Sequence, residues 1–181
     1  LLHMKPPSGF FDKLSMLGTL FGLKNALPKR LKSKGACQQK VQTEPNLYDL
    51  PILTTWSEDG GPFITMGQVY TQSLDGTKQN LGMYRLQVYD KNRLGMHWQI
   101  HKDSAHFFHE YKKAGQKMPV SVAIGGDPLY IWCGQAPMPI GMFELLLYGF
   151  IKEKSARLVK SLTNPIYIPE DVDMVIEGWV D

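Results

Sequence analysis

The stretch Asn80-Leu81-Gly82-Met83-Tyr84-Arg85, followed by Met96-His97-Trp98-Gln99-Ile100-His101, places chemically active side chains on two neighbouring β-type runs. Asn80 offers an amide oxygen, His101 an imidazole nitrogen and, further along the chain, Glu144 a carboxylate. A neutral oxygen, a nitrogen and a carboxylate together suit a hard divalent metal ion. Arg85 adds a guanidinium, which can hold the carboxylate of an acid substrate through two parallel hydrogen bonds.

The sequence around this stretch has a β-rich pattern. Short runs that favour Val, Ile, Thr and aromatic residues lie at about 52–55, 62–70, 82–89, 94–101, 120–125, 155–162 and 173–180. Turn-forming clusters such as Asp75-Gly76-Thr77 separate them. Many short strands with few helices indicate a closed or nearly closed barrel, so we expect a β-rich α+β fold.

Two helices are predicted among these strands. One covers about 104–113, with Asp103 or Ser104 as its N-cap and Gly115 near its C-cap. The other covers about 140–153, and Asp127-Pro128 opens a short helical turn between the two.

Glu144 lies in this second helix, which is the most apolar of the chain. A buried carboxylate costs several kcal/mol unless it is paired or binds a metal. The alternative is a helix-start acid that faces water and is stabilised by the helix dipole.

The first 45 residues differ from the rest of the chain. Apolar residues recur near the helical period between Pro6-Pro7 and Pro28, which indicates an amphipathic helix, and a basic connector over 28–35 follows. Within 1–45, eight Lys and Arg residues face two acids. Either the helix packs on a protein surface beside a solvated basic loop, or this region makes peripheral contact with anionic lipid at the inner membrane face.

Composition limits the class of protein. A chain of 181 residues with 43% hydrophobic content can bury a core as one domain, since domains hold about 100–200 residues. Cys37 and Cys133 have no metal-binding spacing, so we expect packing thiols in a reducing cytoplasm. No apolar run reaches the roughly 18–20 residues of a membrane span. The net charge of +3 gives no indication of a nucleic-acid partner.

Two further motifs have plain structural explanations. His106-x-x-His109-Glu110 has helical spacing but lies on a mixed, solvated helix, so we do not expect a metal site there. Gly125-Gly126-Asp127 lacks the spacing of a phosphate-binding loop and is typical of a turn that ends a strand.

The block from Asn80 to His101 resembles the UbiD family of prenylated-flavin-dependent decarboxylases, and the resemblance covers nearly the whole chain. Further matching stretches follow in the family's order: 36–40 (ACQQK), 119–128 (PVSVAIGGDP), 136–139 (APMP) and 175–178 (VIEG). The resemblance implies a split β-barrel of the flavin-reductase, FMN-binding type with a few peripheral helices. It also implies two regions, an N-terminal helical segment with a basic connector (1–45) and a flavin-binding barrel (46–181).

The resemblance assigns cofactors to particular residues. Asn80, His101 and Glu144 would hold Mn²⁺ or Mg²⁺, with flavin phosphate and water at the remaining positions and K⁺ as a further candidate ion. Arg85 would grip the substrate carboxylate. The positions implied to contact prenylated FMN are Met83, Tyr84, Arg85, His97, Trp98, Gln99, Lys102 and Asp103.

Some positions depart from the family pattern. Where many relatives have His-Arg-Gly, this chain has His101-Lys102-Asp103, which replaces a forked phosphate donor with a point charge and adds an acid. His97 stands where arginine is common.

Arg85 lies five residues after Asn80, so a regular strand would direct the two side chains to opposite faces. We expect a bulge or change of direction that Gly82 permits. The alternative for Arg85 is a surface ion pair.

The implied activity is the non-oxidative decarboxylation of an aromatic acid, with the cofactor as electron sink. A polyprenyl-4-hydroxybenzoate of ubiquinone synthesis is the first candidate substrate, and a naphthoate of menaquinone synthesis is the second. A flavin prenyltransferase would supply the cofactor, and we expect a homo-oligomer. The rivals are a non-catalytic flavin- or metal-binding barrel and a structural domain used for oligomerisation.

We expect the chain to be the middle of a larger enzyme with a further domain on each side. The family's acidic motif, which contains the proton donor, would then lie beyond residue 181, and Glu177 would not be that donor. On this expectation the 181-residue chain alone is inactive and holds no ordered flavin.

Overall fold

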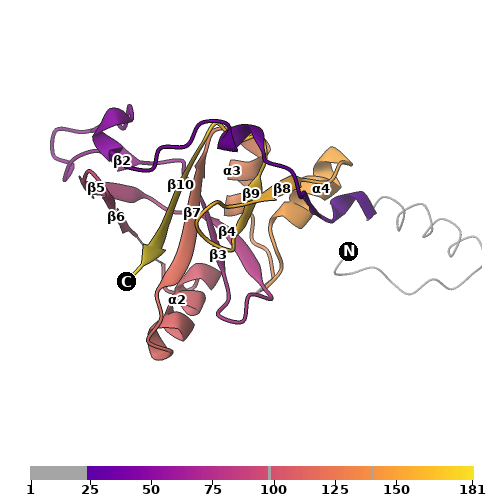
Figure 1. The fold of residues 1–181 in the computed structure, drawn as a ribbon. Helices are drawn as coiled ribbons and strands as arrows, with labels where there is room; N and C mark the ends of the chain where they lie inside the picture. The colour runs from indigo at the N-terminus through magenta and orange to yellow at the C-terminus, as the bar shows by residue number, and fades with distance from the viewer. Residues whose placement is uncertain (1–23, 98, 140) are drawn as a thin grey trace, which may run out of the picture.

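The computed structural model describes residues 24–97, 99–139 and 141–181, and its centre is a four-stranded antiparallel sheet (Figure 1). The strand order in this sheet is β10 (Met174–Val180), β7 (Met118–Ile124), β3 (Gln68–Gln72) and β4 (Gln79–Met83). β10 and β7 pair along their full length, from Met174 opposite Ile124 to Val180 opposite Met118. The first half of the Asn80–His101 block therefore lies in an edge strand of the largest sheet.

Two smaller sheets complete the β-structure. One has the order β2 (Phe63–Ile64), β5 (Leu86–Asp90) and β6 (Arg93–Met96), and it is antiparallel throughout. The other has the order β1 (Lys29–Arg30), β8 (Arg157–Lys160) and β9 (Tyr167–Pro169), with β1 parallel to β8. The three sheets do not close into a ring. The predicted β-rich α+β class, with a split-barrel arrangement, is confirmed.

Helices cover the four-stranded sheet at two places. Helix α2 (Asp103–Lys113) packs on β3, β4 and β7, at the end of the sheet where the chain terminates (Figure 1). Helix α3 (Pro128–Gln135) packs on β4 and on α4 (Leu145–Lys152). Single-turn 3-10 helices, η1 (Ala36–Gln38) and η2 (Leu47–Asp49), lie in the connection between β1 and β2.

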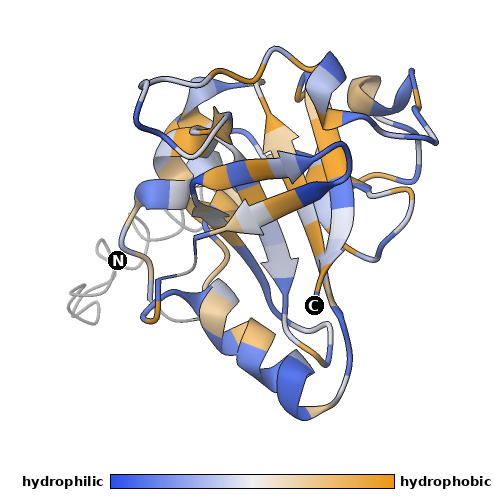
Figure 2. Ribbon diagram, turned by 90° about the vertical axis from the view of Figure 1, so that its left-hand side faces the viewer, coloured by the Kyte–Doolittle hydropathy of each residue, from blue (hydrophilic) through white to orange (hydrophobic). Residues whose placement is uncertain are grey.

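The core forms because the central strands bury both of their faces. In β7 every residue from Met118 to Ala123 is buried, as is expected of a strand covered on two sides. One apolar cluster lies toward α3 and α4 and includes Tyr70, Leu81 and Tyr130. A second lies toward β5 and includes Val69 and Leu86. Figure 2 shows hydrophobic residues along the central strands and hydrophilic residues along α2.

Most predicted strands are present, but several differ from the prediction. The run over 82–89 is divided between β4 and β5, and the run over 94–101 ends at Met96, so His101 lies in a turn and not on a strand. The run over 62–70 is divided into β2 and β3, and a side chain at the intervening Gly67 would come within 3.0 Å of Leu86 and Val122. The strand predicted over 52–55 is wrong, because no described strand lies there. Leu53, Thr54 and Thr55 are all exposed, so this run buries no face.

The predicted helix ends were less accurate than the helices themselves. Lys102, not Asp103 or Ser104, is the N-cap of α2 and makes no side-chain cap bond. The Asp103 carboxylate instead accepts a hydrogen bond from Gly141 N at 2.8 Å, so it is used elsewhere. Gly115 follows the C-cap with a φ of +66°, as glycine commonly does after a helix.

The other two helices also differ in length from the prediction. The helix predicted over 140–153 begins at Leu145. Asp127 caps α3 through a hydrogen bond from Leu129 N, with Pro128 in the first turn, so the expected opening is confirmed and the helix is longer than a single turn.

Part of the basic connector is built into the sheet. β1 pairs with β8 through Lys29 N and Leu31 N, and the Arg30 guanidinium lies 4.4 Å from the centre of the Tyr167 ring. The prediction of a wholly solvated loop over 28–35 is therefore wrong for these residues. The amphipathic segment predicted before residue 24 lies outside the described residues, and the domain boundary at residue 45 stays a prediction.

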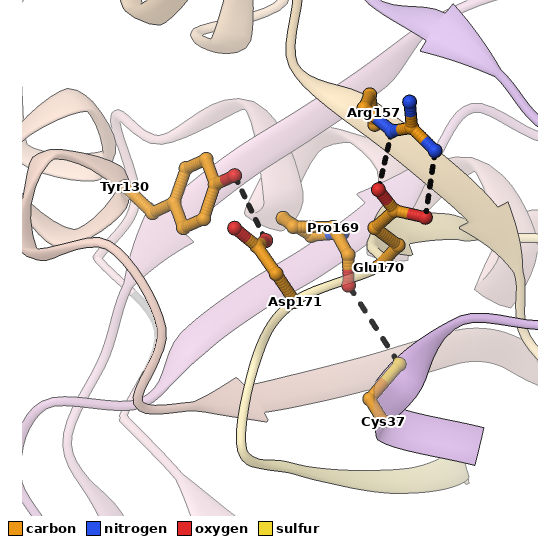
Figure 3. Close-up of polar contacts among 6 residues, drawn as sticks. All are labelled: Cys37, Tyr130, Arg157, Pro169, Glu170 and Asp171. Atoms are coloured by element: carbon orange, nitrogen blue, oxygen red, sulfur yellow. Dashed lines mark hydrogen bonds and ion pairs between the residues drawn. The ribbon is translucent and has the colours of Figure 1, made fainter. Parts of the chain in front are cut away.

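The end of β9 is fixed to three other elements (Figure 3). Arg157 of β8 makes an ion pair with Glu170, the Tyr130 hydroxyl donates to Asp171 at 3.0 Å, and the Cys37 thiol donates to Pro169 O at 3.7 Å.

The two cysteines have the packing role that the sequence predicted. Both are free thiols. Burial raises the pKa of the Cys37 thiol, and it raises that of Cys133 to about 11, so neither is a reactive thiolate at neutral pH.

In the described part of the chain, no helix combines the length and the apolar character that crossing a bilayer requires.

Candidate functional site

A buried carboxylate joins the edge of the four-stranded sheet to helix α4. Glu144 is the residue before α4 and is only 7% exposed. Its Oε1 accepts a hydrogen bond from Asn80 Nδ2 and its Oε2 accepts one from Leu81 N, both at 2.6 Å. The alternative of a water-facing helix-start acid is therefore wrong.

Behind Asn80 the polar network continues into α2 and β3. Ser104 Oγ donates to Asn80 Oδ1 at 2.7 Å, and the hydroxyls of Ser104 and Thr71 lie 2.9 Å apart. Thr71, Asn80, Ser104 and Glu144 are all buried. A buried network of this kind is stable only when each member has its partners, so it fixes the position of the carboxylate.

The site has no cation to balance Glu144 among the described side chains that contact it. Burial and, to a smaller extent, the negative charge of Asp103 raise the pKa of Glu144 to about 7. The hydrogen bonds from Leu81 N and Asn80 act in the opposite direction. A divalent cation beside the carboxylate would offset the cost of burying its charge.

The three predicted metal ligands are only partly brought together. Asn80 and Glu144 touch through the amide nitrogen of Asn80, while the amide oxygen of Asn80 accepts from Ser104. Carboxylate and amide oxygens are the donors that Mg²⁺ and Mn²⁺ prefer. His101 is exposed in the turn before α2, where its ring makes no hydrogen bond to a described residue. Within the described ranges, no group of three or more His, Cys, Asp and Glu side chains is placed to hold a metal. The ligand role of Asn80, His101 and Glu144 stays a prediction.

Arg85 follows the change of chain direction that the sequence predicted. β4 ends at Met83 and β5 begins at Leu86, so Arg85 lies between two sheets. Gly82 itself is paired with Val69 inside β4, so the change of direction comes after it and not at the glycine. A side chain at Gly82 would come within 2.6 Å of the Tyr84 ring, so the glycine leaves room for that ring. Asn80 is consequently buried while Arg85 faces outward.

The Arg85 guanidinium is held by two neighbours. Its Nη2 lies 2.8 Å from Asp59 Oδ1, and its central carbon lies 3.7 Å from the centre of the Phe63 ring. This ion pair agrees with the alternative that the sequence left open. It leaves the role of Arg85 toward a substrate as a prediction.

The predicted flavin contacts form two groups. Met83 ends β4, and Tyr84 and Arg85 follow it before β5. His97, Gln99 and Lys102 lie between β6 and α2, and Asp103 is the first residue of α2. His97 and Gln99 are exposed, and Lys102 and Asp103 are half-buried. Trp98 lies outside the described residues. All these positions lie between Asn80 and Glu144 in the sequence, and their role as flavin contacts also stays a prediction.

Sequence reasoning missed three residues of this region. Ser104 donates a hydrogen bond to Asn80, whereas its position near a helix start indicated only an N-cap. Thr71 carried no signal beyond its β propensity. Asp59 lies in the sequence Ser57-Glu58-Asp59-Gly60-Gly61, a composition typical of a turn.

Comparisons with known proteins place this geometry in a family. Residues 29–181 match the family model described as UbiD, 3-octaprenyl-4-hydroxybenzoate carboxy-lyase Rift-related domain. The chain is 59% identical over 180 residues to an uncharacterized protein of Helicobacter pylori (strain J99), covering 99% of the chain and 29% of that relative. It is 41% identical over 181 residues to an uncharacterized protein of Aquifex aeolicus, covering 100% of the chain and 37% of that relative.

Solved structures agree with this assignment. HmfF from Pelotomaculum thermopropionicum, a UbiD-class enzyme in an evolved dimeric form in complex with prFMN, has a TM-score of 0.79 and 28% identity, over 90% of this chain and 40% of that one. The vanillic acid decarboxylase of Sedimentibacter hydroxybenzoicus in closed form has a TM-score of 0.80 over 95% of this chain and 38% of that one; at 24% identity it shows the fold alone. From the match over residues 29–181, the chain belongs to the UbiD family.

Proposed function

We propose that this chain is the flavin-binding middle region of a larger enzyme that decarboxylates an aromatic acid with prenylated FMN and Mn²⁺ or Mg²⁺. The observation that carries the proposal is the Asn80–Glu144 contact, which places an amide and a carboxylate from distant parts of the chain in one buried site. The likeness to HmfF, whose structure contains prFMN, supports the cofactor. The 3,4-dihydroxybenzoic acid decarboxylase of Enterobacter cloacae, at 26% identity and a TM-score of 0.75, supports an aromatic acid as substrate.

Asn80 and Glu144 have the chemistry to bind the metal. The buried network holds the Glu144 carboxylate in place. The Asn80 oxygen accepts from Ser104 and would offer its second lone pair to a cation. His101 would complete the set on the exposed side, and K⁺ remains a second candidate ion. Such a cation would in turn bind a flavin phosphate, so metal and cofactor retention would depend on each other.

Arg85 has the chemistry to bind the substrate. A guanidinium that stacks on Phe63 and projects outward can present its free N–H groups to a carboxylate. The prenylated flavin, when bound, would accept the electron pair that the departing carboxylate leaves behind. The acid that returns a proton would come from the rest of the full-length enzyme, and assembly as a homo-oligomer remains part of the proposal.

Two candidate substrates fit this chemistry. A polyprenyl-4-hydroxybenzoate of ubiquinone synthesis agrees with the name of the family model, and a naphthoate of menaquinone synthesis is the second candidate. A non-catalytic flavin- and metal-binding domain is the rival function, and it predicts retention of cofactor without turnover.

The deciding experiment is expression of the full-length enzyme together with a flavin prenyltransferase. The purified enzyme should contain prenylated flavin and divalent metal and should release CO₂ from one of the two acids. The Glu144→Gln variant should lose both the divalent metal and the prenylated flavin, because one hard ligand of the metal is removed. A parent enzyme that retains the flavin and releases no CO₂ from any aromatic acid would favour the non-catalytic rival.

A further inference from the structure

We infer that Asp59 is a positioning residue for Arg85, holding its guanidinium in the orientation that grips the substrate carboxylate. The inference rests on the proposed function, because it takes Arg85 as the carboxylate-binding residue. Asp59 lies in the loop before β2, and none of the motif stretches quoted for the family resemblance contains it.

The first observation is that two partners define the plane of the guanidinium. Asp59 Oδ1 accepts from Nη2 at 2.8 Å, and the Phe63 ring lies against the guanidinium face at 3.7 Å. The hydrogen bond to Asp59 fixes the direction of one edge of the guanidinium, and the Phe63 ring fixes the orientation of its plane. A single surface ion pair leaves an arginine free to rotate, whereas this combination does not.

The second observation is the difference in burial between the two charges. The Asp59 side chain is 16% exposed and the Arg85 side chain is 46% exposed. Asp59 Oδ2 is buried and accepts no hydrogen bond from the described residues. The carboxylate is therefore the more buried partner of the pair, while the guanidinium extends toward solvent.

The third observation is that the Asp59 loop is attached to the strand that follows Arg85. Asp59 N donates to Trp56 O at 3.1 Å within the turn, and Gln87 Nε2 donates to Gly60 O at 2.7 Å. A side chain at Gly60 would lie 2.6 Å from Gln87 Nε2, so the Gln87 side chain packs closely against the loop. Asp59 thus has a fixed place relative to Arg85.

The contact leaves enough donors for a substrate. A guanidinium has five N–H groups, and Asp59 accepts from Nη2 alone. The remaining groups can make two parallel bonds to a second carboxylate. Asp59 and a substrate would then occupy different edges of the same guanidinium, which makes Asp59 a support and not a competitor.

The test is a double-mutant cycle in the flavin-loaded, full-length enzyme. We expect Asp59→Asn, which removes the charge with little change of shape, to lower kcat tenfold to about a hundredfold, the loss typical of a misplaced reacting group. In an Arg85→Lys background the same change should alter kcat less than twofold, because the group that Asp59 positions is gone. Flavin content and Tm are measured on every sample.

A matched control and a second variant accompany the cycle. Asp90→Asn removes a carboxylate from another exposed ion pair, with Arg93 at 2.5 Å on the β5–β6 hairpin, and should leave kcat within twofold. Asp59→Glu keeps the charge and should recover part of the lost turnover. If Asp59→Asn does not fold, the cycle is run with Asp59→Glu.

Several results would overturn the inference. The first is a kcat of Asp59→Asn within twofold of the parent. The second is a rise in kcat, which would make Asp59 a competitor for the guanidinium. The third is an equal fall in kcat in the parent and Arg85→Lys backgrounds, which would make Asp59 a structural residue. If Arg85→Lys lowers kcat while Asp59→Asn does not, the inference fails and the proposed function stands. If Arg85→Lys itself has no effect, or the loaded parent has no activity, both fail.

Discussion

Glu144, the residue before helix α4, accepts a 2.6 Å hydrogen bond from Asn80, which lies 64 residues earlier on strand β4. The contact joins the first and last of the predicted metal ligands through their side chains. In the full-length enzyme we predict that Glu144→Gln lowers metal and flavin content together, because the glutamine amide cannot replace a charged oxygen ligand. Elemental analysis and the flavin absorbance of the purified variant check this.

Glu153→Gln is the matched control for this prediction. Glu153 is exposed at the C-cap of the same helix, and its loss should leave both contents unchanged. Equal contents in the Glu144→Gln variant and the parent would show that Glu144 has only a structural role.

Stability of the metal-free chain should depend on pH through the same residue. Burial raises the pKa of Glu144 from 4.5 to about 7, so between these values the folded state binds more protons than the unfolded state. The contribution of Glu144 to the free energy of unfolding is therefore fully present below pH 4.5. It is lost as the pH rises through 7, and the total loss is about 3 kcal/mol. Urea unfolding between pH 4.5 and pH 8 measures the change, and the Glu144→Gln variant should remove this part of it.

A divalent cation should counteract the loss at the upper end of that range. A ligand that binds only the folded state stabilises it, and Mn²⁺ would bind the ionised carboxylate best. If the free energy of unfolding depends equally on pH in the parent and in Glu144→Gln, titratable groups other than Glu144 cause that dependence.

Ser104 should contribute to stability although the sequence indicated only a helix cap. Ser104→Ala leaves Asn80 Oδ1 and the Thr71 hydroxyl without their partner in a buried network. We expect a loss of about 1–3 kcal/mol in the free energy of unfolding, the usual cost of unpaired buried polar groups. Ser57→Ala, at an exposed serine, should change it by less than about 0.5 kcal/mol. Equal effects of the two changes would contradict this role for Ser104.

The sequence predicted the parts of this fold that local pattern controls. The run at 173–180 became β10, and the helix after residue 103 formed because its apolar residues, Phe107 and Tyr111 among them, recur with the helical period. The short strands β1 and β9 were missed. Lys29–Arg30 is basic and has no strand signal. In β9 the β-favouring residues Tyr167 and Ile168 are followed at once by Pro169, so the run is too short to indicate a strand. Both strands form by pairing with β8, which lies between them.

The candidate site was predictable only where one residue type is out of place in its surroundings. Glu144, a carboxylate at the start of an apolar helix, is such a residue, and it proved to be buried. Partners from other elements have no such signal, because a hydrogen bond across 24 residues, as between Ser104 and Asn80, leaves no periodic pattern. Asp59 was missed for the same reason, since its partner, Arg85, is 26 residues away.

Arg85→Lys gives the sharpest test of the substrate site in the full-length enzyme. Lysine keeps the charge but loses the planar fork, so a substrate carboxylate would lose its orientation more than its attraction. We expect normal folding and flavin content with a large fall in kcat, because misplacement affects the reacting step more than binding.

Arg93→Lys provides the comparison, because Arg93 also makes an exposed ion pair with an aspartate and stands on the neighbouring hairpin. A simple surface pair tolerates this exchange, so its kcat should stay within about twofold of the parent, a difference of ~0.4 kcal/mol. Steady-state kinetics on samples matched for flavin content decide between the two roles. If Arg85→Lys also stays within that twofold range, the Asp59 contact is a surface ion pair and Arg85 does not bind the substrate.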